Sequence, residues 1–287
     1  MQTESTFFDE ALAQQNTTTF PQRTQRQLAF TDIIEGFLKW RVWLMLAYQD
    51  LKLRYRRSVL GPFWITISMA VTVYSMGYLY SHLFHTDLQT YFPFLVSGMI
   101  AWTLISSLIT DVTEALYASD GLIKQIKLPY CLYIQRVVVR NIIAFFHNII
   151  VIIPIIIIYH QVAKVNLYTL LLVPGLLLIY FNALVYGLML SMIGARYRDL
   201  VQVIKNLTQV AFFLTPVMWN PQILPEQDRF IVMLNPFYSF VELIRAPLMG
   251  AHPAWATFAM VAVITLIGMV LCLKMFTRYR ARIIYWL

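Results

Sequence analysis

Six long runs without a charged side chain constrain this chain of 287 residues more than any other feature. Counting His as neutral, the runs cover residues 58–86, 88–110, 141–163, 165–195, 206–225 and 246–273. A helix of about 20 apolar residues spans the hydrocarbon core of a bilayer, and every run reaches that length. Only 13% of the residues are charged, against about 25% in a soluble domain. The sequence therefore predicts an all-α integral membrane protein with six transmembrane helices.

The distribution of basic residues predicts the orientation of these helices. Nineteen Lys and Arg residues lie in segments on the side of the N-terminus, and three, Lys164, Arg229 and Arg245, lie on the other side. Positive residues remain on the cytoplasmic side of a membrane, so both termini are predicted to be cytoplasmic. Residues 1–27 lack the apolar core of a cleavable signal peptide, and we expect the first membrane helix to direct insertion.

The chain divides into three predicted parts. Residues 1–30 are expected to form a polar cytoplasmic tail, residues 31–57 an amphipathic helix in the membrane interface, and residues 58–287 the transmembrane domain. From Ile33 onward, apolar residues recur at helical spacing, and Trp40 is of a type that suits the headgroup zone. The alternative is a core helix of a small soluble domain.

Three arginines mark the point where the chain turns from lying along the membrane to crossing it. Arg54, Arg56 and Arg57 cannot enter hydrocarbon cheaply, at roughly 2.5 to 3.5 kcal/mol each at a helix centre. The following Gly61-Pro62 breaks the incoming helix, and Pro suits the first turn of the next one.

The region of residues 215–250 does not fit a simple spanning helix, because prolines recur in it and the charged residues Glu242 and Arg245 interrupt its last apolar stretch, residues 237–248. A seventh spanning helix here would place the basic C-terminus outside. We therefore expect a pair of short re-entrant helices at the periplasmic face, which survive in a membrane when protein covers them or they line a cavity. Glu242 and Arg245 are spaced to pair on one helix face, and Asn235 can bond the backbone groups that Pro236 frees.

Two segments on helices or loops favour packing or docking roles. Within residues 114–130, Asp120 can cap a short helix whose apolar side is Leu122, Ile123 and Ile126, and this helix could lie on the membrane or insert into a groove of a partner. The fourth run carries a small residue at every fourth position, which predicts close packing against another helix, either within the subunit or in a dimer. These small residues are Ala183, Gly187, Ser191 and Ala195.

Motifs for nucleotide or metal chemistry are missing from the sequence. It contains no Walker A motif, no dinucleotide-binding fingerprint and no HExxH, and Cys131 and Cys272 are predicted to be buried free thiols. Asp111 and Glu114 are the only carboxylates near a membrane end on the cytoplasmic side, and no metal-binding partner pair accompanies them. We expect no enzyme activity, no metal site and no bound cofactor in this chain, and ATP hydrolysis would require a separate subunit.

The segments Arg54–Trp64, Lys124–Pro129, Arg196–Leu200 and Leu234–Pro236 together resemble the permease subunit of type-2 ABC exporters that move polysaccharides and polyol phosphates. These are the O-antigen, capsule and teichoic acid transporters. The resemblance implies a homodimer in the bacterial inner membrane, with two copies of an ATP-binding subunit that holds ATP and Mg. It also implies a coupling helix at about residues 118–128.

The resemblance and the residues together predict the channel-forming subunit of an ATP-driven exporter of a lipid-linked polysaccharide, with membrane lipids but no nucleic acid as further contacts. Guanidinium groups suit pyrophosphate oxygens, although topology and anionic lipid contact explain the same arginines. The alternatives are a permease for small lipids or drugs and a membrane enzyme that acts on polyprenyl lipids. The predicted site residues are Arg54, Arg56, Arg57, Leu60 and Gly61 where substrate enters, Tyr74, Tyr78, Phe212 and Phe213 along its path, Asp120, Gly121, Lys124 and Lys127 for ATPase coupling, and Asn235, Pro236, Glu242 and Arg245 at the periplasmic gate.

Overall fold

The structure is a computed structural model that describes residues 24–83 and 85–287, and every regular element in this part of the chain is a helix, with no strand. In chain order the elements are α2 (Gln25–Leu38), α3 (Trp40–Arg54), α4 (Phe63–Leu83), α5 (Leu88–Glu114), η1 (Tyr117–Ser119), α6 (Asp120–Gln125), α7 (Tyr130–Ile149), α8 (Ile152–Ile158), η2 (Leu167–Leu171), α9 (Leu172–Arg196), α10 (Arg198–Leu214), η3 (Pro221–Ile223), η4 (Glu226–Asp228), α11 (Arg229–Leu234), α12 (Pro236–Leu248), α13 (Trp255–Tyr279), η5 (Arg280–Arg282) and α14 (Ile283–Trp286).

Four helical segments of the described chain have the length and apolar composition to cross a membrane, which makes this a multi-pass membrane protein. They are Leu88–Glu114, Tyr130–Ile158, Leu167–Arg196 and Trp255–Trp286. The other two predicted spans correspond to α4 and α10. Ser, Thr and Tyr lower the hydropathy of α4, while α10 has 17 residues and begins with charged side chains.

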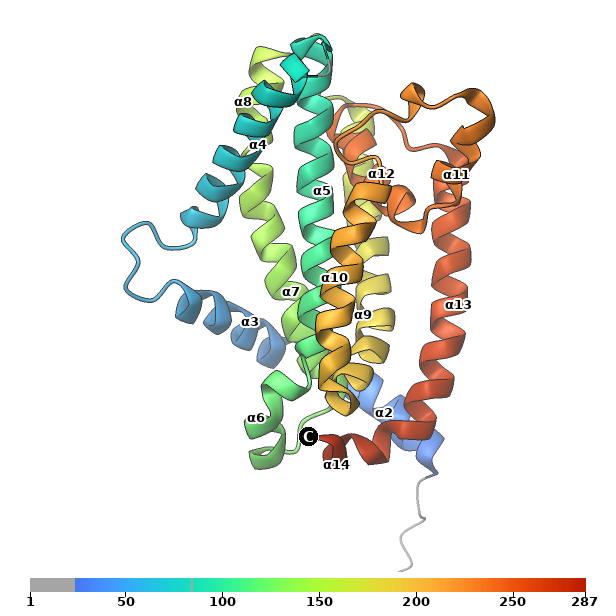
Figure 1. Cartoon of the computed structure of the whole chain (residues 1–287). Helices are drawn as coiled ribbons and strands as arrows, with labels where there is room; N and C mark the ends of the chain where they lie inside the picture. Colours follow the sequence, from blue (N-terminus) through green and yellow to red (C-terminus); the bar gives the residue numbers. More distant parts are fainter. Residues whose placement is uncertain (1–23, 84) are drawn as a thin grey trace, which may run out of the picture.

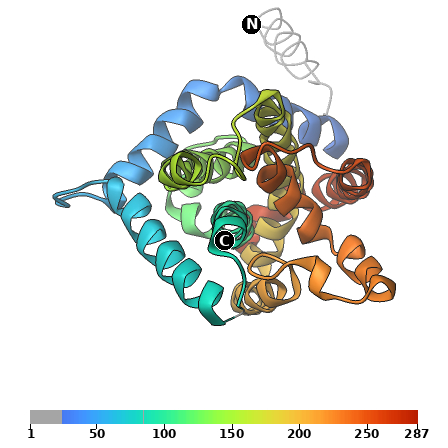
Figure 2. The same cartoon turned by 90° about the horizontal axis from the view of Figure 1, so that it is seen from above.

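The long helices run antiparallel (Figure 1). We call the end of the bundle that holds α2, α3, α6 and α14 the basic end. Helices α4, α7 and α10 run away from the basic end, and α5, α9 and α13 return to it. Seen from above, α2 and α3 wrap around one side of the bundle at this end (Figure 2). The first described residues and the C-terminus therefore lie at the same end.

The predicted interfacial helix is two helices. Helix α2 begins at Gln25, inside the segment predicted to be a tail, because Thr24 and Gln27 form a reciprocal capping box. It ends at Leu38, and α3 starts at Trp40 after a non-helical Lys39. Residues 1–23 of the predicted tail lie outside the described residues.

Helix α7 begins eleven residues before the third uncharged run, at Tyr130. The run was bounded by Arg140, but Arg136 and Arg140 are neutralised by carboxylates of neighbouring helices. A helix can therefore continue through both charges. The fifth run also differs, because α10 extends from Arg198 to Leu214 and stops two residues before Pro216.

Helix α5 forms the core of the bundle and packs against α4, α7, α9, α10 and α12. Its backbone approaches α9 closely, since a Cβ atom added to Gly194 would lie 2.2 Å from the Thr113 carbonyl oxygen. A Cβ atom at Gly187 would lie 3.2 Å from the side chain of Val112. Ser191 and Ala195 are also buried. The stripe of small residues in α9 thus packs within the subunit.

Helices α11 and α12 have 6 and 13 residues and cannot span a bilayer. They lie away from the basic end, beside the far end of α10 (Figure 1). The chain then turns at Gly250, whose positive φ of 75° suits glycine, and returns in α13. The pair of short helices predicted from the prolines is therefore present.

Candidate functional site

The elbow, residues 54–62 from the last residue of α3 to the start of α4, exposes the predicted cluster of arginines. Arg54, Arg56 and Arg57 are all solvent-exposed, and within the described part of the chain none has a carboxylate at ion-pair distance. Arg57 and Gly61 adopt positive φ angles of 67° and 56°. The loop that contains Leu60 thus turns sharply, and the three guanidinium groups remain available to an anionic group.

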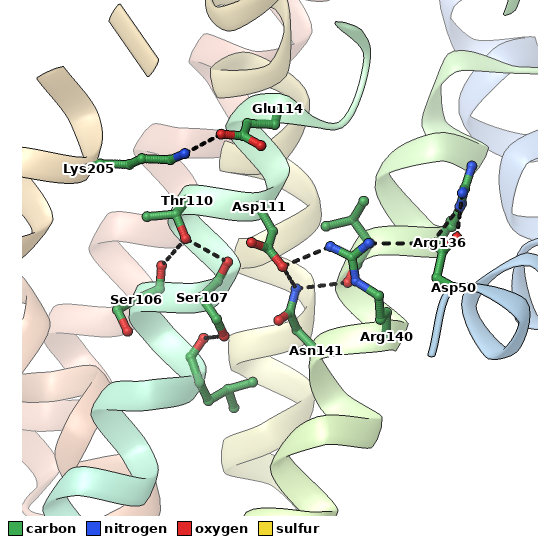
Figure 3. Close-up of polar contacts among 12 residues, drawn as sticks. Asp50, Ser106, Ser107, Thr110, Asp111, Glu114, Arg136, Arg140, Asn141 and Lys205 are labelled. Carbon is green, nitrogen blue, oxygen red and sulfur yellow. Dashed lines mark hydrogen bonds and ion pairs between the residues drawn. The ribbon is translucent and has the colours of Figure 1, made fainter. Parts of the chain in front are cut away.

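A layer of charged side chains lies inside the bundle near the basic end (Figure 3). Arg136 of α7 donates to both carboxylate oxygens of Asp50 of α3, at 2.7 and 2.5 Å. Arg140, one turn further along α7, lies 3.4 Å from Asp50 and 2.8 Å from Asp111 of α5. Asn141 also donates to Asp111, at 3.0 Å. We call these five residues the polar layer; it joins α3, α7 and α5.

A further ion pair continues from α5 to α10. Glu114, in the last turn of α5, pairs with Lys205 (Figure 3). Both carboxylates that an enzyme at this end would use, Asp111 and Glu114, are therefore engaged by cations. The described residues also contain no cluster of three metal-ligating side chains. This arrangement suits a structural or mechanical role better than acid–base or metal chemistry.

Asp32 of α2 binds two other segments at the basic end, the start of α7 and η5. Its side chain is 1% exposed and accepts the backbone N–H of Cys131, in the first turn of α7, at 3.1 Å. Arg280 of η5 donates to the other carboxylate oxygen at 3.1 Å through Nε. Burial raises the pKa of Asp32 above its ordinary value, although the Cys131 N–H and Arg280 oppose that shift. Both cysteines are free and buried, as predicted.

The predicted coupling helix is a short turn followed by α6 and lies at the basic end (Figure 1). The prediction that Asp120 caps this helix is wrong, because Ser119 is the N-cap and Asp120 pairs with Lys124 at 2.8 Å. Gly121 and Lys127 are exposed, and Ile126 is 49% exposed just past the helix. This segment therefore presents a small mixed surface that could contact a partner.

The four aromatic residues predicted along a substrate path divide into two kinds. Tyr74 is half-buried and donates its hydroxyl to the Val151 carbonyl at 2.7 Å, while Phe212 packs 5.6 Å from the ring of Trp102. Tyr78 and Phe213 are 65% and 67% exposed. The first two have packing partners inside the subunit, and the last two face its surface.

An apolar cavity of about 720 Å³ opens between α9 and α10, with α5, α12 and α13 contributing to its walls. Leu207 and Phe240 are typical of the lining, which also includes Thr208 and Asn182. Such a lining can accommodate hydrocarbon and offers few hydrogen-bonding groups to a sugar.

Asn235, at the start of α12, binds this helix to the end of α10. Asn235 caps α12 by accepting the Phe237 N–H at 2.9 Å, and it donates to the Thr215 hydroxyl at 3.0 Å. Arg245 pairs with Glu242 at 3.1 Å, as its spacing predicted. Pro236 occupies the first turn of α12, as its fixed φ allows.

Arg245 makes contacts that its spacing did not predict. Its guanidinium donates to the carbonyl oxygens of Pro216 and Val217 at 2.8 and 3.0 Å and lies 4.0 Å from the ring centre of Phe94. Gly98 leaves room for it, since a Cβ atom there would lie 2.2 Å from the guanidinium. These carbonyls follow α10, so Arg245 stabilises the turn at which that helix ends.

The profile of the ABC-2 type transporter family matches residues 41–249. The chain belongs to this family. A match of this extent begins at the second residue of α3 and continues past the end of α12. It includes the polar layer, the elbow, the segment with the predicted coupling helix, and the short helices α11 and α12. Membership makes the chain a transporter permease that works with an ABC ATP-binding subunit.

Curated relatives are similar over most of their length. The O-antigen export system permease protein RfbA of Klebsiella pneumoniae is 21% identical over 202 residues, which are 69% of this chain and 76% of the relative. A second protein of that name from the same species gives the same figures. RfbA of Myxococcus xanthus is 24% identical over 205 residues, 71% of this chain and 78% of the relative.

The sequence analysis missed the polar layer. Arg136 and Arg140 enter the sequence analysis only among the basic residues on the cytoplasmic side, and Asp50 is given no role. One signal was present: Arg136 and Arg140 are four residues apart and so lie on one face of a helix. That α3 and α5 would supply the matching carboxylates depends on tertiary packing and was not visible in the spacing.

Proposed function

We propose that this permease exports a lipid-linked polysaccharide of the O-antigen or capsule class from the cytoplasm across the bacterial inner membrane. The single observation that carries the proposal is the likeness to the O-antigen export permeases over about 70% of the chain.

In this proposal six helices cross the membrane: α4, α5, α7 with α8, α9, α10 and α13. The basic end faces the cytoplasm with both termini, because lysines and arginines concentrate there. Two copies of the chain form a channel between them, and two ATP-binding subunits hold ATP and Mg. The helices α11 and α12 dip into the periplasmic side as a gate, anchored to α10 by Asn235 and Arg245.

The elbow would receive the lipid pyrophosphate at the inner leaflet. Arg54, Arg56 and Arg57 are exposed and lack carboxylate partners in the described chain, so their donors can pair with phosphate oxygens. The exposed rings of Tyr78 and Phe213 would give sugars a flat surface for C–H stacking. Tyr74 and Phe212 would support the path from the interior of the subunit.

The coupling segment, residues 115–129, would contact the ATP-binding subunit through Ile126 and Lys127. Both are exposed and take no part in the ion pair that Asp120 and Lys124 form within α6. The test is co-purification with the ATP-binding subunit and an assay of hydrolysis with and without lipid-linked glycan. Glycan should stimulate hydrolysis in the complex, and Lys127→Glu should weaken the association. Lys39→Glu is the matched control, because it reverses the charge of an exposed lysine outside the coupling segment.

A second candidate, a permease for small lipids or drugs, is favoured by the apolar cavity between α9 and α10. Hydrolysis stimulated by small amphiphiles and unaffected by glycan would support it. In that case the three arginines of the elbow would serve only membrane topology and contact with anionic lipids.

A further inference from the structure

The coupling segment, residues 115–129, is held between two helices that carry partly buried charges. Helix α5 ends immediately before it at Glu114, and α7 begins immediately after it at Tyr130. Arg136 lies about two helical turns from the start of α7. A displacement of the segment therefore acts first on α5 and α7, which carry Asp111, Arg136 and Arg140 of the polar layer.

The polar layer connects these two helices to the elbow. Asp50 is one turn before Arg54, the last residue of α3, so a movement of Asp50 carries the start of the elbow with it. The side chains of Asp50 and Arg136 are 12% and 22% exposed, which protects their interaction from solvent screening.

Apolar packing alone would fix α3 to α7 less firmly. The buried residues of α3 are Ala47 and Leu51, and such contacts can slide by small amounts. A guanidinium fork on a carboxylate fixes direction as well as distance, because two parallel hydrogen bonds must be kept. Arg136 makes this two-point contact with Asp50, and Arg140 links the same carboxylate to α5.

We propose that Arg136 and Arg140 are positioning residues that transmit the movement of the coupling segment to the elbow through Asp50. The inference rests on the proposed function only in requiring an ATP-driven partner at the coupling segment. Two carboxylates, Asp50 and Asp111, balance the two guanidiniums, so the layer is electrically neutral. It therefore differs in role from the exposed arginines of the elbow, which can receive an anion.

The test follows the elbow directly in lipid vesicles that contain the permease and its ATP-binding subunit. Val59 is 99% exposed, so Val59→Cys can carry an environment-sensitive fluorophore, while the two buried native cysteines react slowly. Addition of ATP should change the fluorescence. Asp50→Asn or Arg136→Gln should reduce that change about tenfold, and the double variant should lose no more than either single variant.

The matched control is the exposed ion pair Glu35–Lys39 of α2, with its atoms 3.7 Å apart. Glu35→Gln with Lys39→Gln should leave the ATP-induced change intact. The proposal would be overturned if the protein with Val59→Cys alone shows no change of fluorescence on addition of ATP. A full change in Asp50→Asn and Arg136→Gln, or additive losses in the double variant, would also overturn it. The readout needs no cargo, so a substrate other than glycan would refute the proposed function alone.

A second measurement separates mechanical transmission from damage to the fold. In Asp50→Cys with Arg136→Cys, a fluorescent amino acid incorporated at position 59 replaces the thiol-attached label. A short bifunctional thiol reagent can then replace the ion pair with a covalent link without reacting at the probe. The link should restore the ATP-induced change at Val59, in complexes that still bind the ATP-binding subunit. Failure to restore it in such intact complexes would overturn the proposal.

Discussion

At the scale of single residues, Arg245 shows how one buried cation can hold α12 against the turn that follows α10. Its surface is 2% exposed, and it satisfies Glu242 together with the carbonyl oxygens of Pro216 and Val217. Removing one partner of a buried charge pair costs about 3–5 kcal/mol, because the other partner is left uncompensated.

We expect Arg245→Met to raise ion leak through reconstituted vesicles without ATP more than Glu242→Ala does. Arg245→Met leaves Glu242 and two carbonyl groups unpaired, whereas in Glu242→Ala the guanidinium keeps both carbonyls and the face of Phe94. A double variant should leak as much as Arg245→Met. Vesicles that stay equally tight with both single variants would remove the gate role from this pair.

Asp32 should make the attachment of α2 dependent on pH. Its pKa is raised in the folded protein, mainly by burial, so folding favours the protonated form. The stabilising contribution of that form is complete at pH values below the unfolded pKa and is lost as the pH rises through the folded pKa. Thermal unfolding in detergent should therefore show the native protein losing stability relative to Asp32→Asn as the pH rises. A difference between them that is independent of pH would contradict this assignment.

At the scale of elements, the contact between α9 and α5 depends on the absence of side chains. Gly194→Ala would place a Cβ atom 2.2 Å from the Thr113 carbonyl oxygen, and such overpacking destabilises a protein by about 1–3 kcal/mol. Gly121→Ala is the control, because no atom lies within 4 Å of the added Cβ. A lower unfolding temperature is expected for Gly194→Ala alone, and equal unfolding temperatures would argue that the two helices separate easily.

The sequence predicted which helices exist better than it predicted the residues at which they begin and end. Uncharged runs indicated the long helices, but they placed the start of α7 at Asn141 instead of Tyr130, because the charges of Arg136 and Arg140 are neutralised by residues distant in sequence. Helical spacing indicated an amphipathic segment before the elbow, but not the break at Lys39. The pair of short helices was predictable, because Asn235-Pro236 carries a local signal.

The predictions for the site follow the same division. The charge of the arginines at the elbow predicted that they are exposed. The spacing of Glu242 and Arg245 predicted that these two residues pair. The polar layer and the carbonyl groups held by Arg245 join segments tens of residues apart, so no local pattern reveals them.

At the scale of the whole molecule, the antiparallel arrangement makes a prediction about topology. Reporter domains fused at residues 287 and 228 should read cytoplasmic and periplasmic, because the C-terminus lies at the basic end and Asp228 precedes α11 near the opposite end (Figure 1). A periplasmic reading at residue 287 would contradict the topology of six spanning helices.

As an exporter of lipid-linked glycan, the permease with its ATP-binding subunit should move this cargo across the membrane when ATP is hydrolysed. The most direct measurement uses inside-out vesicles that hold the permease and its ATP-binding subunit, with lipid-linked glycan in the outer leaflet and a glycosidase added outside. With ATP, a growing fraction of the glycan should become protected from the enzyme, and no protection should develop with a non-hydrolysable analogue or without the permease. Glycan that stays fully digestible while ATP is hydrolysed would contradict the account.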